Sequence, residues 1–359
     1  MIPVTVITGF LGSGKTTLLN ALLQHPALAD TAVIINEFGE IAIDHMLVSS
    51  PAENMVLLDT GCLCCTVRGD LVQTLATLHE KRKSGAIPVF ARVLIETTGL
   101  ADPVPLLQTI VADPALNDAY ALNGVVTTVD AVHGEHQLDG HAESVKQAAV
   151  ADALLITKTD LASSAVTQAL IERLRRFNPG ADVHAVTQGC IEPALVLQVG
   201  LYDAAARVRD VREWLKEDAH AHALDVYGHT HGADRHDARI RAYCVFHERP
   251  IKRAGLVMWL DMIANLRGAN LLRVKGLLNV EGDPVVVHAV QTVVHEPRVL
   301  DTWPVDDRRS RLVFIGRDIE RAQIERTLGA LDYSPTGLGR TTVDVRAYEQ
   351  FVSMMKAFR

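Results

Sequence analysis

The sequence predicts an α/β protein in which a mainly parallel sheet with helices on both faces is followed by a smaller α+β domain. Through the first half, apolar β-branched runs alternate with helical patterns, and nearly continuous apolar strands are typical of a parallel sheet buried on both faces. After about residue 239 the pattern changes to hairpin-like strands and helices, which is typical of an antiparallel sheet. The length of 359 residues suits two domains.

The first domain is expected to span residues 1–207. Its predicted strands are the apolar runs Val4–Thr8, Ala32–Ile35, Met55–Leu58, Val89–Ile95, Gly124–Val129, Ala153–Thr157 and Asp182–Val186. Helical spacing of apolar residues predicts helices over Lys15–Leu23, Gly69–Lys83, Ser144–Ala151 and Ala165–Phe177.

Residues 208–238 are charged and rich in histidine, so we expect an exposed connector. The second domain should span 239–331, with 332–359 as a loosely attached tail. Glu281-Gly282-Asp283 separates two β-branched runs and predicts a hairpin turn. The expected elements are a strand Ile240–Phe246, a helix Pro250–Leu266, paired strands Leu271–Val280 and Val285–Val294, a strand Leu312–Ile315 and a helix Ile319–Leu331.

The charge balance excludes some classes of protein. Lys and Arg number 35 against 43 Asp and Glu, a net charge of −8, whereas general nucleic-acid binding needs a basic face. No apolar run reaches about 20 residues, so no membrane-spanning helix is expected. The N-terminal residues lack the basic start and cleavage site of a signal peptide, which predicts a cytoplasmic location.

A phosphate-binding loop is predicted between the first strand and the first helix, because residues 9–16 fit G-x-x-x-x-G-K-[ST] in the required context. Backbone N–H groups and the helix N-terminus would surround the phosphates. Lys15 would reach the β- and γ-phosphates, and the Thr16 hydroxyl would bind Mg²⁺. The expected nucleotide-binding residues here are Gly9, Phe10, Leu11, Gly12, Ser13, Gly14, Lys15, Thr16 and Thr17.

A second motif predicts which nucleotide base is bound. Thr157-Lys158-Thr159-Asp160 ends a buried strand and resembles the Asn-Lys-x-Asp motif with which GTPases read guanine, with Thr157 in place of asparagine. The Asp160 carboxylate would accept hydrogen bonds from guanine N1–H and the amino group, a donor pair that adenine lacks. The Lys158 stem would lie along the base, and the strand end at 185–187 is a candidate second contact.

The strand that ends at Glu96 carries Glu-x-x-Gly, which looks like the Asp-x-x-Gly of GTPases. Glu96 would hold Mg²⁺ through water, and the Gly99 N–H would sense the γ-phosphate. Lys15, Thr16 and Glu96 are therefore the candidate catalytic residues. Leu100 follows where a water-orienting glutamine could stand, so we hypothesise slow intrinsic GTP hydrolysis.

Three of the five cysteines lie within four residues, which suggests metal or redox chemistry in a cytosolic chain. In an extended segment Cys62 and Cys64 point to one side, and a turn can bring Cys65 round. Such thiolates form a soft site for Zn²⁺ or Co²⁺. The alternative is a tight turn built from small residues.

Six segments together resemble the CobW/YjiA family of GTPases: GFLGSGKTT, NEFGE, GCLCC, ETTGLADP, VDAVH and TKTD. The resemblance spans nearly the whole chain and implies a metallochaperone-type GTPase that handles zinc or cobalt for a client metalloprotein. The family's metal motif corresponds to the three clustered cysteines. Related GTPases often dimerise, so the resemblance is compatible with a homodimer.

The family's switch-loop acids correspond to Glu37 and Glu40, which the resemblance adds to the metal ligands. Some members carry a further acid at the position of Ile35, so that ligand is absent here. The cysteine turn lies between this loop and the Glu96 strand. We hypothesise that the GTP state holds metal and that hydrolysis releases it, a coupling that must be mutual.

The connector offers further imidazoles, which suit zinc, cobalt and nickel alike. The candidates are His220, His222, His229 and His231; in the alternative interpretation they belong to a solvated linker. Two other classes of function stay open: an ATP-dependent P-loop enzyme in which the cysteines only shape a turn, and a non-catalytic metal buffer.

Overall fold

The computed structural model describes residues 1–35, 56–59, 67–200, 239–267, 270–291, 293–294, 297–304 and 306–334. These residues form two compact units, one up to residue 200 and one from residue 239. The boundaries predicted at 207 and 238 lie outside the described residues and stay predictions.

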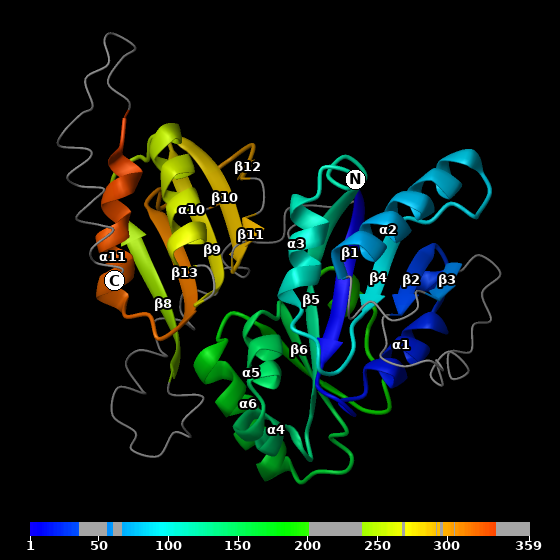
Figure 1. The fold of residues 1–359 in the computed structure, drawn as a ribbon. Helices are drawn as coiled ribbons and strands as arrows, with labels where there is room; N and C mark the ends of the chain where they lie inside the picture. The colour runs from blue at the N-terminus through cyan, green and yellow to red at the C-terminus, as the bar shows by residue number, and fades with distance from the viewer. Residues whose placement is uncertain are drawn as a thin grey trace. The chain divides into compact units, whose positions relative to one another are not determined.

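The first unit contains a sheet of seven parallel strands in the order β3-β2-β4-β1-β5-β6-β7 (Figure 1). All seven predicted strands are present, and the prediction of a parallel sheet is confirmed. The strand expected from Val89 begins only at Arg92, because Val89 is an exposed apolar residue outside the ladder. The strands are β1 Ile2–Gly9, β2 Thr31–Ile35, β3 Val56–Asp59, β4 Arg92–Glu96, β5 Tyr120–Asp130, β6 Ala153–Thr157 and β7 Asp182–Val186.

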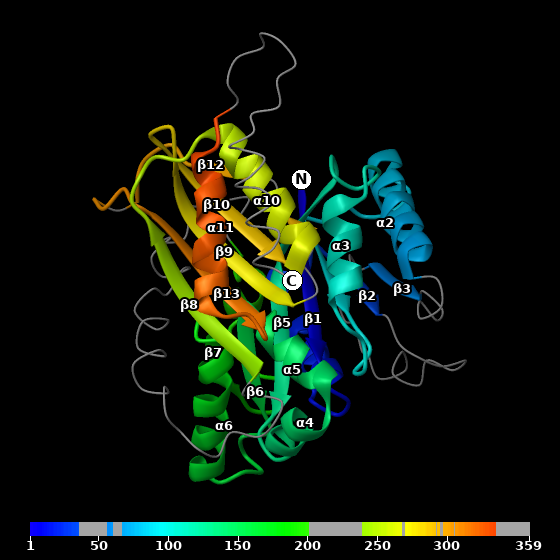
Figure 2. The ribbon, with the colours of Figure 1, turned by 60° about the vertical axis from the view of Figure 1, so that its left-hand side comes forward.

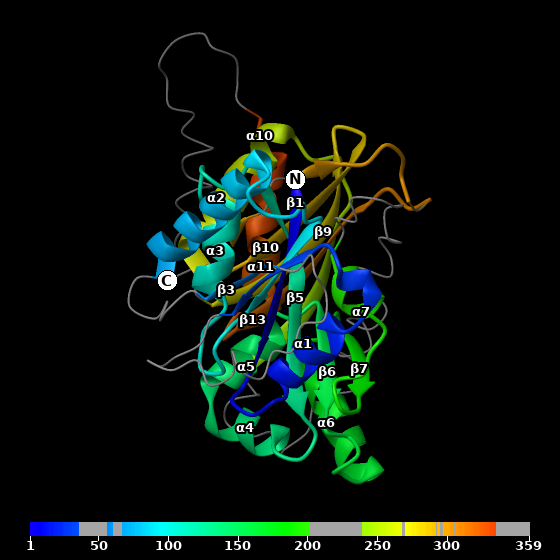
Figure 3. The same cartoon turned by 90° about the vertical axis from the view of Figure 1, so that its right-hand side faces the viewer.

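Helices cover both faces of this sheet, as predicted. The helices are α1 Lys15–Leu23, α2 Val67–Ser84, α3 Val104–Ala112, α4 Gly134–Gly140, α5 Ala142–Ala149, α6 Ser164–Phe177 and α7 Ala194–Leu197, with a 3₁₀ turn at Pro26–Leu28. α1 and α7 share one buried cluster with Val126 of β5 (Figure 3). The next residue, Thr127, points to the opposite face and donates from Oγ1 to the Gln147 carbonyl of α5 at 2.8 Å.

Three of these helices were not predicted. α4 and α7 are short, with 7 and 4 residues, and too brief to show a helical period. α3 is rich in Val, Ile and Leu, so its composition resembles that of a strand. Its start is set locally, because Pro103 precedes it and the Asp102 carboxylate accepts from the Val104 N–H at 3.1 Å.

The second unit is an antiparallel sheet in the order β11-β10-β9-β13-β8, with β12 paired to β10. The predicted strand Val285–Val294 divides into β10 and β11 because the chain turns at Gln291, whose φ is +50°. The predicted final helix is α11 followed by a 3₁₀ turn. The bounds are β8 Ile240–His247, α10 Arg253–Arg267, β9 Leu271–Val280, β10 Asp283–Val290, β11 Val293–Val294, β12 Arg298–Val299, β13 Ser310–Arg317, α11 Arg321–Thr327 and a 3₁₀ turn, Leu328–Asp332.

The helices of the second unit pack on one face of its sheet, and Figure 2 shows α10 and α11 lying over it. Trp259 of α10 is fully buried against Phe314 of β13, with the ring centroids 6.0 Å apart. Its indole N–H donates to Thr327 Oγ1 at 2.9 Å, so the polar atom of this large core side chain is satisfied.

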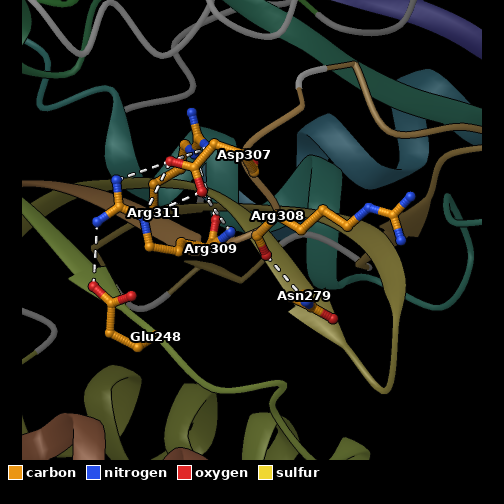
Figure 4. Close-up of polar contacts among 6 residues, drawn as sticks. All are labelled: Glu248, Asn279, Asp307, Arg308, Arg309 and Arg311. Atoms are coloured by element: carbon orange, nitrogen blue, oxygen red, sulfur yellow. Dashed lines mark hydrogen bonds and ion pairs between the residues drawn. The ribbon is translucent and has the colours of Figure 1, made fainter.

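A network of charged side chains orders the chain that enters β13 (Figure 4). The Asp307 carboxylate accepts from Arg309, whose guanidinium also bonds Glu248 and stacks on Phe246 with 5.0 Å between the guanidinium carbon and the ring centroid. Hydrogen bonds from Arg309 lower the pKa of Asp307 to about 2. Arg311 donates to the Asp307 carbonyl at 2.7 Å, so the network is internal to this unit.

None of the described helices is long and apolar enough to cross a bilayer.

Candidate nucleotide-binding site

The chain between β1 and α1 adopts a conformation that requires glycine. Gly9, Gly12 and Gly14 have φ values of +145°, +72° and +88°. A Cβ at Gly9 would lie 2.3 Å from Thr128 Oγ1 and 2.5 Å from the Thr128 carbonyl oxygen of β5. The positive φ values favour glycine at all three positions, and at Gly9 the neighbouring strand also leaves no room for a side chain.

Lys15 lies at the centre of this loop. Its side chain is buried, and Nζ donates to the carbonyl oxygens of Gly9 and Phe10 at 2.9 and 3.2 Å. An ammonium held by loop carbonyls at the start of a helix creates local positive potential, where backbone N–H groups also gather. This arrangement is suited to the β- and γ-phosphates of a nucleotide.

Thr16 and Glu96 come together although 80 residues separate them in sequence. Thr16 Oγ1 donates to Glu96 Oε1 at 3.0 Å, and Glu96 is buried at the end of β4. β4 is the direct neighbour of β1, with Ile7 opposite Glu96, so the sheet register brings the carboxylate beside the loop. A hydroxyl and a carboxylate are oxygen ligands of the kind that Mg²⁺ prefers.

Gly99 lies directly against the phosphate loop. A Cβ at Gly99 would be 2.6 Å from the Leu11 backbone nitrogen and 2.7 Å from its Cα, so only glycine permits this contact between the two backbones. The structure thus places the Glu-x-x-Gly loop beside the residues expected to hold phosphate. Leu11 and Leu100 are about half exposed, at 53% and 52%.

The Thr-Lys-x-Asp segment lies on the other side of the loop. Thr157 Oγ1 donates to the Ser13 carbonyl at 2.7 Å, so the threonine that replaces the usual asparagine contacts the phosphate loop directly. Lys158 has a φ of +56°, an uncommon conformation for a side-chain-bearing residue. Asp160 is exposed at the end of this turn, where its carboxylate is accessible to a base.

Sequence reasoning missed Asp130, which holds Lys158. Its side chain is 1% exposed, and it accepts from Lys158 Nζ at 2.7 Å and from the backbone N–H groups of Val132 and His133 at 2.7 and 3.2 Å. Burial raises the pKa of Asp130, but these donors outweigh it and leave the pKa below its ordinary value. The carboxylate is therefore ionised. A usable signal was its position directly after the predicted strand Gly124–Val129; in the structure it is the last residue of β5.

Gly189 was also missed. Its φ is +76°, and a Cβ there would lie 2.6 Å from the Thr17 carbonyl oxygen of α1. Thr187 and Thr159 hydroxyls lie 3.2 Å apart, so the loop after β7 contacts both α1 and the Thr-Lys-x-Asp segment. The second contact expected at 185–187 thus adjoins the same turn as Asp160.

The candidate metal ligands Glu37, Glu40, Cys62, Cys64, Cys65, His220, His222, His229 and His231 all lie outside the described residues. Elsewhere, in the ranges that the structure covers, no cluster of three or more His, Cys, Asp or Glu side chains is arranged for a metal ion. The described strands do set the order of their attachments: Ile35 of β2 pairs with both Asp59 of β3 and Glu96 of β4. The segments that carry Glu37 and Cys62 therefore leave neighbouring strand ends.

A glycine-rich loop with a buried lysine, at the end of the central strand of a parallel sheet, defines a P-loop nucleotide-binding protein. The model of the CobW/HypB/UreG nucleotide-binding domain matches residues 3–185, and that of the cobalamin synthesis protein cobW C-terminal domain matches residues 240–331. The chain belongs to the CobW/HypB/UreG family.

Relatives match over nearly the whole chain. The zinc chaperone YjiA of Escherichia coli K12 is 32% identical over 332 residues, which cover 92% of this chain and 98% of that protein. The zinc chaperone CobW of a Sinorhizobium species is 27% identical over 368 residues, covering 92% and 97%. The crystal structure of the Zn(II)-bound YjiA GTPase from E. coli superposes with a TM-score of 0.66 at 27% identity, covering 92% of this chain and 98% of that one.

Proposed function

We propose that this protein is a GTPase that couples slow GTP hydrolysis to the binding and delivery of a transition metal, zinc or cobalt, to a client metalloprotein. The observation that carries the GTPase part is the convergence of Lys15, Thr16 and Glu96 at the phosphate loop. Two relatives are zinc chaperones by name, which supports a metal cargo and favours zinc.

The residues at the phosphate loop fit Mg²⁺. Thr16 Oγ1 and Glu96 Oε1, 3.0 Å apart, would hold the ion directly or through water. A bound Mg²⁺ supplies neutralisation of charge on the transferring phosphate. Lys15 would exchange its bonds to the loop carbonyls for bonds to phosphate oxygens. Leu100 offers no group that could orient the attacking water, which is why hydrolysis should be slow.

The preference for guanine rests on the accessible Asp160 carboxylate and on the fixed Lys158. Asp130 holds the Lys158 ammonium, so the aliphatic stem of Lys158 is kept in one position beside the turn that carries Asp160. A lysine stem fixed in this way can cover one face of a purine ring, while Asp160 reads its edge.

Asp130→Asn is expected to weaken GTP and GDP binding equally, by about tenfold, because it removes a charge-assisted hydrogen bond to Lys158. The asparagine oxygen can still accept from the Val132 and His133 N–H groups, so the turn itself should persist. Isothermal titration with both nucleotides measures the effect. Asp139→Asn is the matched control, because Asp139 also pairs with a basic side chain, Arg173, which belongs to none of the nucleotide-binding motifs. Wild-type affinity in Asp130→Asn would contradict the role of Lys158.

The metal part is tested by GTP turnover with Mg²⁺, with and without one equivalent of Zn²⁺ or Co²⁺, in wild type and in a Cys62/Cys64/Cys65→Ser variant. Metal is expected to change turnover only when the three thiols are present, since a single strand, β2, separates the end of β3, from which the thiol segment leaves, from the end of β4, which carries Glu96. Cys190→Ser is the matched control, because Cys190 is an exposed cysteine outside the motif. Turnover that ignores both metal and thiols would exclude the coupling and leave a GTPase without a metal-linked cycle.

A further inference from the structure

One helix contacts both of the loops that border the phosphate site. At the start of α5, the ring of His141 stacks on Phe10 of the phosphate loop, with the centroids 4.5 Å apart. Figures 1 and 3 show the arrowhead of β1 ending beside α5. Further along α5, Lys146 Nζ lies 2.9 Å from Asp102 Oδ2 in the loop that follows Glu96.

Gln147 makes the deepest of these contacts. Its side chain is fully buried, and Nε2 donates to the carbonyl oxygens of Gly99 and Ala101 at 3.2 and 2.9 Å. Oε1 has no hydrogen-bond partner in the described part of the chain. The amide is therefore present for its N–H donors, because a buried amide oxygen without a partner is a cost that an apolar side chain would avoid.

Gly99, whose carbonyl oxygen Gln147 bonds, must be placed accurately. Gly99 lies against the Leu11 backbone with no room for a Cβ, so a small shift of its loop would either separate it from the phosphate loop or cause a clash. Gln147 bonds only the carbonyl oxygen of Gly99, so the N–H of Gly99 can face another group.

We infer that Gln147 is a positioning residue for recognition of the γ-phosphate: it holds the 99–101 loop so that the Gly99 N–H is presented to a nucleoside triphosphate. This inference rests on the proposed function. A diphosphate lacks the γ-phosphate to which the Gly99 N–H would be presented, so Gln147 contributes to the preference for GTP over GDP rather than to binding of both. Lys146, through Asp102, acts on the same loop.

Asn178 provides a matched control. It is also a buried amide, 1% exposed, and its Nδ2 donates to the carbonyl oxygens of Ala148, Ala149 and Ala151 at 2.8, 3.3 and 3.0 Å. It thus supports the opposite end of α5 with the same kind of bond, but its side chain makes no hydrogen bond to the 99–101 loop. Loss of either amide should lower stability, whereas only Gln147 should alter the discrimination between nucleotides.

The test compares dissociation constants for GDP and for a non-hydrolysable GTP analogue, with Mg²⁺, in wild type, Gln147→Met, Lys146→Met and Asn178→Leu. The ratio of the two constants is expected to shift against the analogue by about 3- to 10-fold in Gln147→Met, the equivalent of one lost hydrogen bond. Lys146→Met removes a partly exposed ion pair and should keep the fold. It should shift the ratio in the same direction by about twofold, because ion pairs near the surface contribute little free energy. Asn178→Leu should leave the ratio unchanged while lowering the melting temperature.

An unchanged ratio in both Gln147→Met and Lys146→Met would overturn the inference, as would an equal shift in Asn178→Leu. If Gln147→Met does not fold, the ratio in Lys146→Met decides. A wild-type protein that binds neither guanine nucleotide would refute the proposed function itself, and this outcome is seen before any variant is compared.

Discussion

Replacement of Lys15 by methionine is expected to lower GTP turnover by at least about 100-fold, because one charged donor to developing phosphate charge commonly supplies two to three orders of magnitude. Methionine keeps most of the buried stem, so the packing around α1 should survive. Only the ammonium that now bonds the Gly9 and Phe10 carbonyls is lost. Steady-state phosphate release and GTP titration measure the two effects separately.

The control for this variant is Lys81→Met, a change of the same chemistry at an exposed position in the last turn of α2. It should turn over GTP at the wild-type rate. A Lys15→Met protein that keeps its circular dichroism spectrum and also its turnover would show that phosphate chemistry does not occur at this loop.

The second large effect concerns the base. Asp160→Asn is expected to weaken GTP binding by about 100-fold, since two hydrogen bonds to a charged acceptor are replaced by one neutral acceptor and a repelling donor. The same variant should gain affinity for xanthosine triphosphate, because xanthine carries a carbonyl where guanine carries its amino group, and an asparagine N–H can donate to it. Competition titrations with the two nucleotides measure this exchange.

Asp118→Asn is the matched control, because Asp118 is exposed just before β5. It lies at the amino end of this strand, whereas Asp160 follows the carboxyl end of the parallel strand β6. It should bind both nucleotides as the wild type does. Wild-type protein that binds ATP as tightly as GTP, with no response to Asp160→Asn, would support the ATP-dependent alternative instead.

The parallel sheet and the phosphate loop were predictable because the relevant information is local. Each strand is a short apolar run, and residues 9–16 form a continuous segment whose glycines adopt positive φ values wherever a strand meets a helix in this way. Short helices were harder. α4 and α7 are shorter than the window over which a helical period can be recognised, and the composition of α3 resembles that of a strand.

Residues that support the site through long-range contacts escaped prediction. Asp130 acts on Lys158 because β5 and β6 are neighbours in the sheet, and Gln147 acts on Gly99 because α5 packs beside the loop after β4. In sequence, Asp130 is a single acid at the end of a strand, and Gln147 is one polar residue on the buried face of a helix. Neither pattern predicts which group the side chain contacts.

The sequence by itself determined the class of fold, the phosphate loop, the residues that follow each strand and the cysteine cluster, because these depend on hydrophobic periodicity and on contiguous motifs. Only the tertiary structure decided which of these groups meet. The order β3-β2-β4-β1-β5-β6-β7 brings Glu96 to Thr16 and Thr157 to the Ser13 carbonyl across gaps of 80 and 144 residues. Strand order depends on the packing of the whole sheet and its helices, a sum of many weak contacts that no single segment of the chain encodes.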